Sequence, residues 1–160
     1  MHLITTNFIF LGGKMELNKM MEVLDDLINK ENIDKVINDI LQQINKITEK
    51  ILDVAEKNKV YDFQHGSIRV FRTQFRFGTG YITTYVLRVN GRGVPKDADH
   101  LGYDYHPYGN FDNYARYMDL DDIRDFVNDI EGFIQAFKEH VEKHREELLE
   151  LKEEIAKVSL

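Results

Sequence analysis

The chain has 160 residues, of which 42% are hydrophobic and 31% charged, and its net charge at neutral pH is −7. This length and balance describe one globular domain and exclude a disordered tail. The chain holds no cysteine, which excludes disulfides, thiolate metal ligands and a cysteine nucleophile. No apolar run approaches the roughly 18 residues of a membrane span, and we expect a cytoplasmic protein.

Residues 1–14 have two interpretations. They lack the basic region and the small-residue cleavage site of a signal peptide. The segment that ends at Met15 can be encoded as TTA-GGA-GGT-AAA-ATG, which places a ribosome-binding site before a start codon. We therefore interpret residues 1–14 as a mis-called leader and residues 15–160 as a single domain. The alternative is that residues 3–10, which are rich in β-formers, add a strand to a sheet.

Two amphipathic helices are predicted over residues 15–59. Between residues 15 and 30, apolar side chains recur at steps of three and four, which is the mark of one buried helical face. Asn32 then provides a helix N-cap. A second helix with the same spacing follows from Ile33 to about Lys59.

The strongest pattern predicts one long helix over residues 119–158. Two seam positions of a heptad are apolar at eleven of twelve sites, and the exception is His144. The first position holds Leu120, Val127, Ile134, Val141, Leu148 and Ile155, and the second holds Ile123, Ile130, Phe137, His144, Leu151 and Val158. Phe126 and Phe133 widen the stripe in the first half, so we expect that half to contact two neighbours and the second half only another helix.

A β-hairpin is predicted over residues 67–90, with strands at 68–77 and 81–90 around a three-residue loop, Gly78-Thr79-Gly80. This loop pairs Phe77 with Tyr81 and Phe71 with Leu87. The register gathers the aromatic residues on one face, which we expect to pack on the Phe126 and Phe133 side of the long helix. The opposite face would then hold Arg72, Arg76 and Arg88.

Residues 91–118 form a loop without a clear period that is dense in tyrosine, aspartate and histidine. Together these elements predict an α+β, mainly α, fold in the order helix, helix, hairpin, loop, long helix. We expect long antiparallel coiled-coil-like helices that flank the central β-hairpin.

The basic middle of the chain is the first candidate site. Six basic residues and no acidic residue lie between Phe63 and Lys96. Guanidinium groups beside aromatic rings suit phosphate contacts and base stacking, although arginines on a strand also solubilise it or guard an edge. The candidate polyanion-binding residues are Arg69, Arg72, Arg76, Arg88, Arg92 and Lys96.

The second candidate is a cluster of carboxylates and imidazoles, which can together hold a divalent metal. Its spacing does not match an EF-hand, and turn formation is the plainer interpretation. The candidate ligands are Asp97, Asp99, His100, Asp104 and His106.

We expect a non-enzymatic binding or assembly protein without a cofactor. Its coiled coil would present the basic aromatic hairpin and the tyrosine-rich loop to a macromolecular partner, with Tyr103, Tyr105 and Tyr108 as contact residues. The residue 120–158 seam would bind a protein partner or a second copy. The alternatives are a nucleic-acid-binding protein that uses the basic hairpin face, and a metal-dependent hydrolase or nuclease that uses the Asp/His loop.

Overall fold

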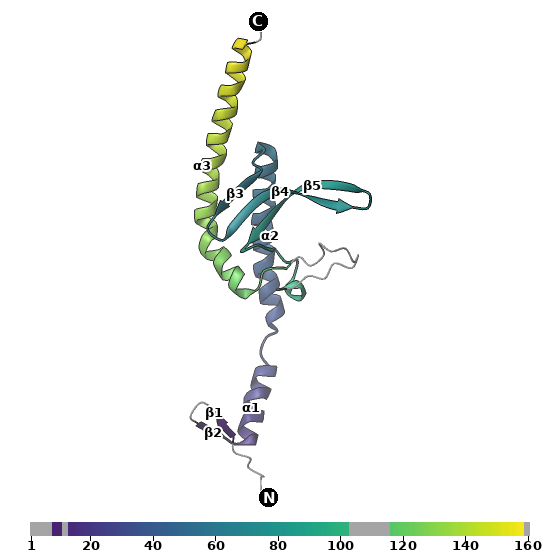
Figure 1. Ribbon diagram of the computed structural model, residues 1–160. Helices are drawn as coiled ribbons and strands as arrows, with labels where there is room; N and C mark the ends of the chain where they lie inside the picture. The colour runs from purple at the N-terminus through teal and green to yellow at the C-terminus, as the bar shows by residue number, and fades with distance from the viewer. Residues whose placement is uncertain (1–7, 11–12, 103–115, 159–160) are drawn as a thin grey trace, which may run out of the picture. The chain divides into compact units, whose positions relative to one another are not determined.

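The computed structural model describes residues 8–10, 13–102 and 116–158 and divides the chain into two compact units, Met1–Ile33 and Asp34–Leu160. The division falls after Ile33, and the boundary after Lys14 stays a prediction. Figure 1 gives the order of the elements along the chain. Among the described helices, none combines the length and the apolar character of a membrane span.

The first unit contains a two-stranded sheet and one helix. Strand β1 (Phe8–Phe10) pairs antiparallel with β2 (Gly13–Met15), and helix α1 (Leu17–Ile28) follows. The β-forming residues near the N-terminus thus pair with their own neighbours. That residues 1–14 are a mis-called leader stays a prediction. Helix α1 lies within the predicted range, and none of its residues is buried.

The second unit places a four-stranded antiparallel sheet on two helices. Helix α2 (Ile33–Asn58) is followed by strands β3 (Asp62–His65), β4 (Ile68–Phe77), β5 (Gly80–Val89) and β6 (Arg92–Gly93). The short helix η1 (Ala98–His100) and helix α3 (Leu120–Val158) complete the unit. The strands lie in the order β3-β4-β5-β6. The predicted α+β, mainly helical class is confirmed, and α3 is one unbroken helix, as the periodicity predicts.

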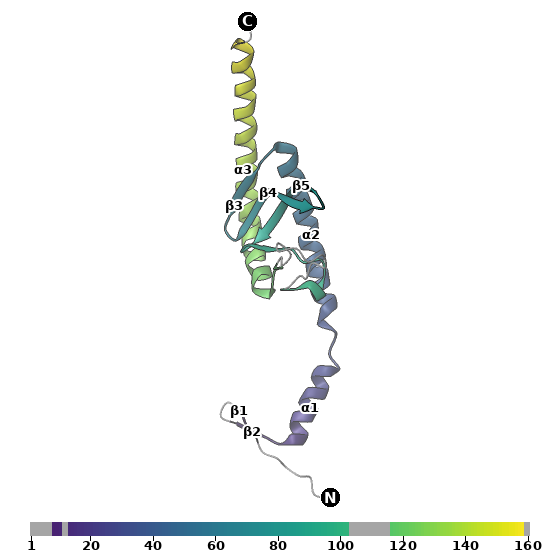
Figure 2. The same cartoon turned by 45° about the vertical axis from the view of Figure 1, so that its right-hand side comes forward.

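Helices α2 and α3 run in the same direction, so the predicted antiparallel arrangement is wrong. Ile47 of α2 lies beside Ile130 and Ile134 of α3, and Asn58 lies beside Arg145, further along both helices. The cause is β3, which the sequence did not predict. Because β3, β4 and β5 cross the body three times, the chain returns to the level where α2 began before α3 starts (Figures 1 and 2).

The β4–β5 hairpin is present, but its predicted register is wrong by one residue. Phe77 pairs with Gly80 and Val70 with Leu87 around a two-residue loop that begins with Gly78 at φ +60°. A slip of one residue turns every side chain to the opposite face. The aliphatic residues decide the register, because it places Ile68, Val70, Leu87 and Val89 together on the buried face.

The core therefore forms between that aliphatic face and both helices. Helix α2 contributes Leu41, Ile44, Ile51 and Ala55, and α3 contributes Ile123, Phe126, Phe133, Phe137 and Val141. Phe63 of β3 supplies the sheet's aromatic contact, since its ring centroid lies 5.5 Å from those of Phe133 and Phe137. Phe75, Phe77 and Tyr81 of the hairpin are exposed, so the expected aromatic face packed on α3 is not formed. Tyr85 is partly buried against the core.

The buried stripe of α3 differs from the predicted heptad seam in its first half. Phe126 and Phe133 are buried, whereas Leu120, Val127 and Ile134 are exposed. A single partner helix would cover a narrow seam, but α3 packs here against β3 and the β4–β5 hairpin, with Ile47 of α2 beside it. The wide stripe therefore follows the ordinary helical period instead of a strict heptad.

A network around Asp122 fixes the start of α3. The Asp122 carboxylate is 2% exposed and accepts hydrogen bonds from Asn90 Nδ2 at 2.8 Å and from Arg92 Nη1 at 3.1 Å. Asp119 and Asp122 each accept the other's backbone N–H at 3.0 Å, which caps the helix N-terminus. Burial raises the pKa of Asp122, but these hydrogen bonds and the Arg92 charge outweigh it and hold the pKa below its usual value.

Asp122→Asn should lower the free energy of unfolding by about 2–3 kcal/mol, because it removes the buried negative charge and turns one acceptor oxygen into an NH₂ group that faces part-buried donors. Urea unfolding measures the loss. Asp121→Asn changes the neighbouring residue, whose carboxylate is exposed in its pair with Arg124, and should cost about 0.5 kcal/mol or less.

The same network sets an acid dependence. Because folding lowers the pKa of Asp122, its contribution is complete above the unfolded value of about 3.9 and is lost as pH falls below it. Below about pH 4, the free energy of unfolding of Asp122→Asn should therefore fall less steeply than that of the wild type. Equal losses for both variants, or an unchanged acid profile, would contradict the role of Asp122.

Candidate functional site

The sheet has one face on the helices and one outer face that no described element covers. The outer face carries Arg69, Phe71, Thr73, Phe75 and Phe77 of β4 and Ile82, Thr84, Val86 and Arg88 of β5. The distal half of the β4–β5 ribbon projects away from both helices (Figure 1). The outer face and this projecting ribbon are the two candidate binding surfaces.

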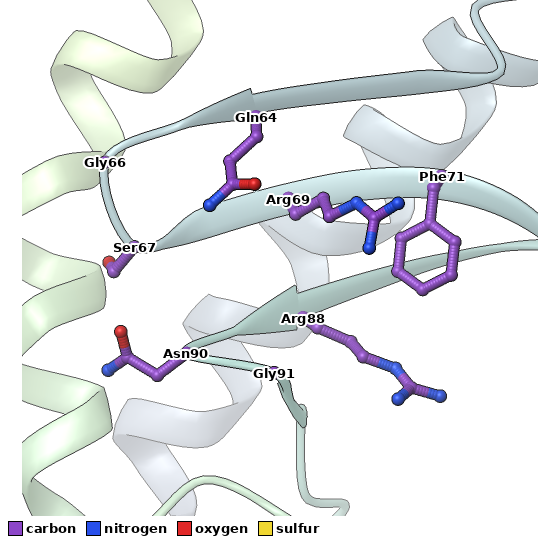
Figure 3. Close-up of a pocket in the computed structure, with 8 residues that line it drawn as sticks. All are labelled: Gln64, Gly66, Ser67, Arg69, Phe71, Arg88, Asn90 and Gly91. Carbon is purple, nitrogen blue, oxygen red and sulfur yellow. The ribbon is translucent and has the colours of Figure 1, made fainter.

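A cavity of about 300 Å³ lies on the outer face, where β3, β4 and β5 meet their turns. Arg69 and Arg88 are directly opposite each other in the strand register, and both extend toward Phe71 (Figure 3). The cavity is lined by Gln64, Gly66, Ser67, Arg69, Phe71, Arg88, Asn90 and Gly91.

One of these two arginines already has an acidic partner. Arg69 donates to both oxygens of Asp62, at 2.9 and 2.8 Å, and its guanidinium carbon lies 4.2 Å from the centre of the Phe71 ring. The hydrogen bond from Arg69 lowers the pKa of Asp62. Arg88 lies 5.6 Å from the same ring, and no carboxylate in the described part of the chain forms an ion pair with it. Arg88 therefore supplies the cavity's uncompensated positive charge.

The turn that borders this cavity is fixed to α3. Gly66 has φ +60°, and a Cβ atom at this position would lie 2.8 Å from Asp129 Oδ2. The same oxygen accepts the Ser67 N–H at 2.8 Å, and the bonds from Ser67 lower the pKa of Asp129. The positive φ and the close approach of the Asp129 side chain therefore both favour glycine at this position.

The expected basic cluster of Arg72, Arg76 and Arg88 is not formed. Arg72 and Arg76 lie on the opposite face from Arg88, because the register differs by one residue from the predicted one. Arg72 lies 4.0 Å from the centre of the Tyr61 ring, and Arg92 pairs with Asp122. Lys96 is exposed in the segment after β6. Of the six predicted basic residues, the strand register brings only Arg69 and Arg88 together.

Large apolar side chains gather at the end of the projecting ribbon. Phe77 is 73% exposed and Tyr81 is 69% exposed, and Phe75 and Ile82 beside them are also exposed. These four residues are called the hairpin tip; Phe75, Phe77 and Ile82 lie on the outer face of the ribbon and Tyr81 lies on the opposite face. They lie beyond the part of the ribbon that packs on the helices, so they contribute little to the core.

The Asp/His candidates that the structure describes form a turn. Asp97 Oδ1 accepts the Asp99 N–H at 3.0 Å and lies 2.7 Å from His100 Nδ1. The hydrogen bond with His100 lowers the pKa of Asp97. Asp104 and His106 lie outside the described residues, and within the described ranges no three acidic, histidine or cysteine side chains are grouped for a metal.

Tyr103, Tyr105 and Tyr108 of the tyrosine-rich loop also lie outside the described residues. Its ends are fixed to the body. Gly93 N–H donates to Arg116 O at 2.9 Å, Met118 N–H donates to Gly93 O at 2.9 Å, and the Met118 side chain is fully buried.

Sequence reasoning missed the strands that complete this site. Asn90 and Gly91 both have positive φ, at 53° and 78°, and form the turn between β5 and β6. An Asn-Gly pair after a strand is a strong hairpin signal, so β6 was predictable. Strand β3 has only four residues and no apolar alternation, so it carries no comparable signal.

Comparisons with protein-family models, with curated proteins and with solved structures find no match to this chain.

Proposed function

We propose that this chain is a non-enzymatic binding and assembly protein that presents the hairpin tip to a protein partner. The observation that carries the proposal is the exposure of Phe75, Phe77, Tyr81 and Ile82 at the end of a projecting ribbon. Grouped apolar side chains on a surface mark interaction sites more often than isolated ones do. Aromatic residues are also enriched among those that dominate binding energy.

The ribbon's construction supports this role. Strands β4 and β5 are paired along ten residues each, and their proximal ends are anchored by four buried aliphatic residues. A two-stranded ribbon is only marginally stable in water by itself. A rigid base with an uncovered apolar end suits insertion into, or docking on, another protein, which would then shield the tip.

We also propose that α3 provides the assembly contact, as a coiled coil formed outside the body. The supporting observation is that apolar seam positions continue along its C-terminal part, where they are exposed. The scaffold would then hold the hairpin tip of each copy away from the self-association site.

The hairpin tip can be tested with a photo-cross-linker at Thr79, because the chain has no natural cysteine to compete. A Thr79→Cys variant labelled with a benzophenone maleimide should cross-link one defined protein in an extract of the native cells. Adding Phe77→Ser and Tyr81→Ser should remove at least about nine tenths of this product, since each removes an aromatic anchor. The thermal midpoint should change little.

The matched control is Glu49→Cys, which places the same label at an exposed position of α2. It should not give the same product. A product from position 79 that survives the double substitution, or the absence of any defined product, would contradict the proposal.

We propose nucleic-acid binding as a second candidate, and the outer-face cavity is the observation that favours it. Arg88 brings a charge without a described acidic partner, and Phe71 brings a ring on which a base could stack. The neighbouring Arg69–Asp62 pair and the negative net charge weigh against strong binding.

Anisotropy of a labelled single-stranded oligonucleotide at low salt tests this candidate. Arg88→Ala should weaken binding roughly tenfold, because it removes the uncompensated charge of the cavity. Arg76→Ala, which removes an equal charge from the other face of the sheet, should change affinity little. Equal affinities for wild type and Arg88→Ala would eliminate nucleic-acid binding at this cavity.

A further inference from the structure

The apolar seam of α3 continues past the end of the helix that covers it. Arg145 Nη1 donates to Asn58 Oδ1 at 2.8 Å, and Asn58 is the last residue of α2. Beyond this point Leu151 is 57% exposed and Ile155 is 65% exposed. The seam runs at alternating steps of four and three through Phe137, Val141, His144, Leu148, Leu151, Ile155 and Val158.

The first members of this seam are in the core and the last are not. Phe137 and Val141 are buried, whereas Leu148, Leu151, Ile155 and Val158 are all exposed. Since the spacing is unbroken along one helix, the exposed four face the same side as the buried members. Figures 1 and 2 both show this part of α3 extending beyond α2 and the sheet.

We infer that residues 148–158 of α3 pair antiparallel with the same segment of a second copy of this chain. The inference deepens the proposed assembly function, because it names the partner of α3 and the orientation of the contact. It is independent of the hairpin tip, which lies on a different element.

The pattern of the exposed segment fits a helix as the occupant. The seam is narrow, and the residues between its members are mostly charged, so one helix and not a sheet would cover it. It also continues, without interruption, a seam that α3 already uses for internal packing.

The same pattern fits a second copy. The spacing of the four exposed residues is three, four, three, which reads identically in both directions. In an antiparallel pair Leu148 therefore lies opposite Val158 of the other copy, and Leu151 lies opposite Ile155. One patch is thus complementary to itself, as a two-fold interface requires.

Steric fit favours the antiparallel orientation, although the charges favour the parallel one. In a parallel pair, Glu147 would face Lys152 of the other copy, which is favourable, but such exposed ion pairs contribute little. The parallel pair would also bring the second copy's body into the space that α2 and β3 occupy, because the seam faces that side. The antiparallel pair places the two bodies at opposite ends of the overlap and avoids this clash.

The antiparallel orientation has a measurable electrostatic consequence. Lys152 then lies near Lys152 of the other copy, and Glu154 near Glu154, so like charges flank the seam. Salt should therefore strengthen the association, because it screens the repulsion. A parallel pair would be weakened by salt instead.

Sedimentation velocity over a range of concentrations tests the association. The wild-type chain should show a monomer–dimer equilibrium that shifts toward dimer at higher salt, and Leu151→Glu with Ile155→Glu should weaken it at least about a hundredfold. Leu149→Glu is the matched control, since Leu149 is equally exposed on the same turn but lies off the seam. It should dimerise as wild type does.

Cysteine cross-linking tests the orientation in the same chain. Leu151→Cys and Ile155→Cys chains, oxidised as a mixture, should form a disulfide dimer between the two variants, and each variant oxidised alone should form far less. A dominant dimer from either variant alone would overturn the antiparallel arrangement. A wild-type chain that stays monomeric at all concentrations, or a double glutamate variant that still dimerises, would overturn the interface itself.

These outcomes are separable from those of the hairpin experiment. The double glutamate variant should keep the cross-link from position 79, and the Phe77→Ser, Tyr81→Ser variant should keep the α3 dimer. Circular dichroism should show the same helix content in all variants, because the substituted seam residues are exposed in the single chain.

Discussion

The packing of one aliphatic sheet face against two helices is the constraint on which the rest of this structure depends. Ile68, Val70, Leu87 and Val89 are buried together only when Val70 pairs with Leu87. Burying each such side chain contributes about 1.5–3 kcal/mol, which exceeds any preference that exposed aromatic residues have for a shared face. The register, the outer face and the direction of the projecting ribbon all follow from this burial.

The same register determines how the basic residues are used. It places Arg69 and Arg88 on the outer face and Arg72 and Arg76 on the other. Two of the arginines predicted to bind a polyanion have acidic partners inside the chain. Arg69 forms an exposed pair with Asp62, and Arg92 belongs to a network with the buried Asp122. The exposed pair contributes little to stability, whereas loss of the buried Asp122 carboxylate would leave part-buried donors without their acceptor.

The helices were predictable because their signal is local. The spacing of apolar residues predicted α2 to about Lys59 and α3 to Val158, and the helices end at Asn58 and Val158. The direction of α3 relative to α2 was not predictable, because it depends on the short strand β3. The predicted register was wrong because it placed the aromatic residues Phe71, Phe75 and Phe77 on the buried face. Aliphatic residues occupy that face instead.

The candidate site was predictable only in part for the same reason. The predicted basic segment contains the residues that line the cavity, but the pairing of Arg69 with Arg88 and the contribution of Gln64 both depend on strands in contact. The hairpin tip is exposed because the ribbon is longer than the part of it that packs on the helices. Such a difference in length is a property of the assembled unit and leaves no mark in a local sequence pattern.

The register of β4 and β5 is the most direct test of this account, and cross-strand nuclear Overhauser effects measure it. We expect backbone contacts between Val70 and Leu87 and between Arg69 and Arg88. Contacts between Phe71 and Leu87 and between Arg69 and Val89 would contradict it, because that register turns the aliphatic residues apart and removes the face on which the core is built.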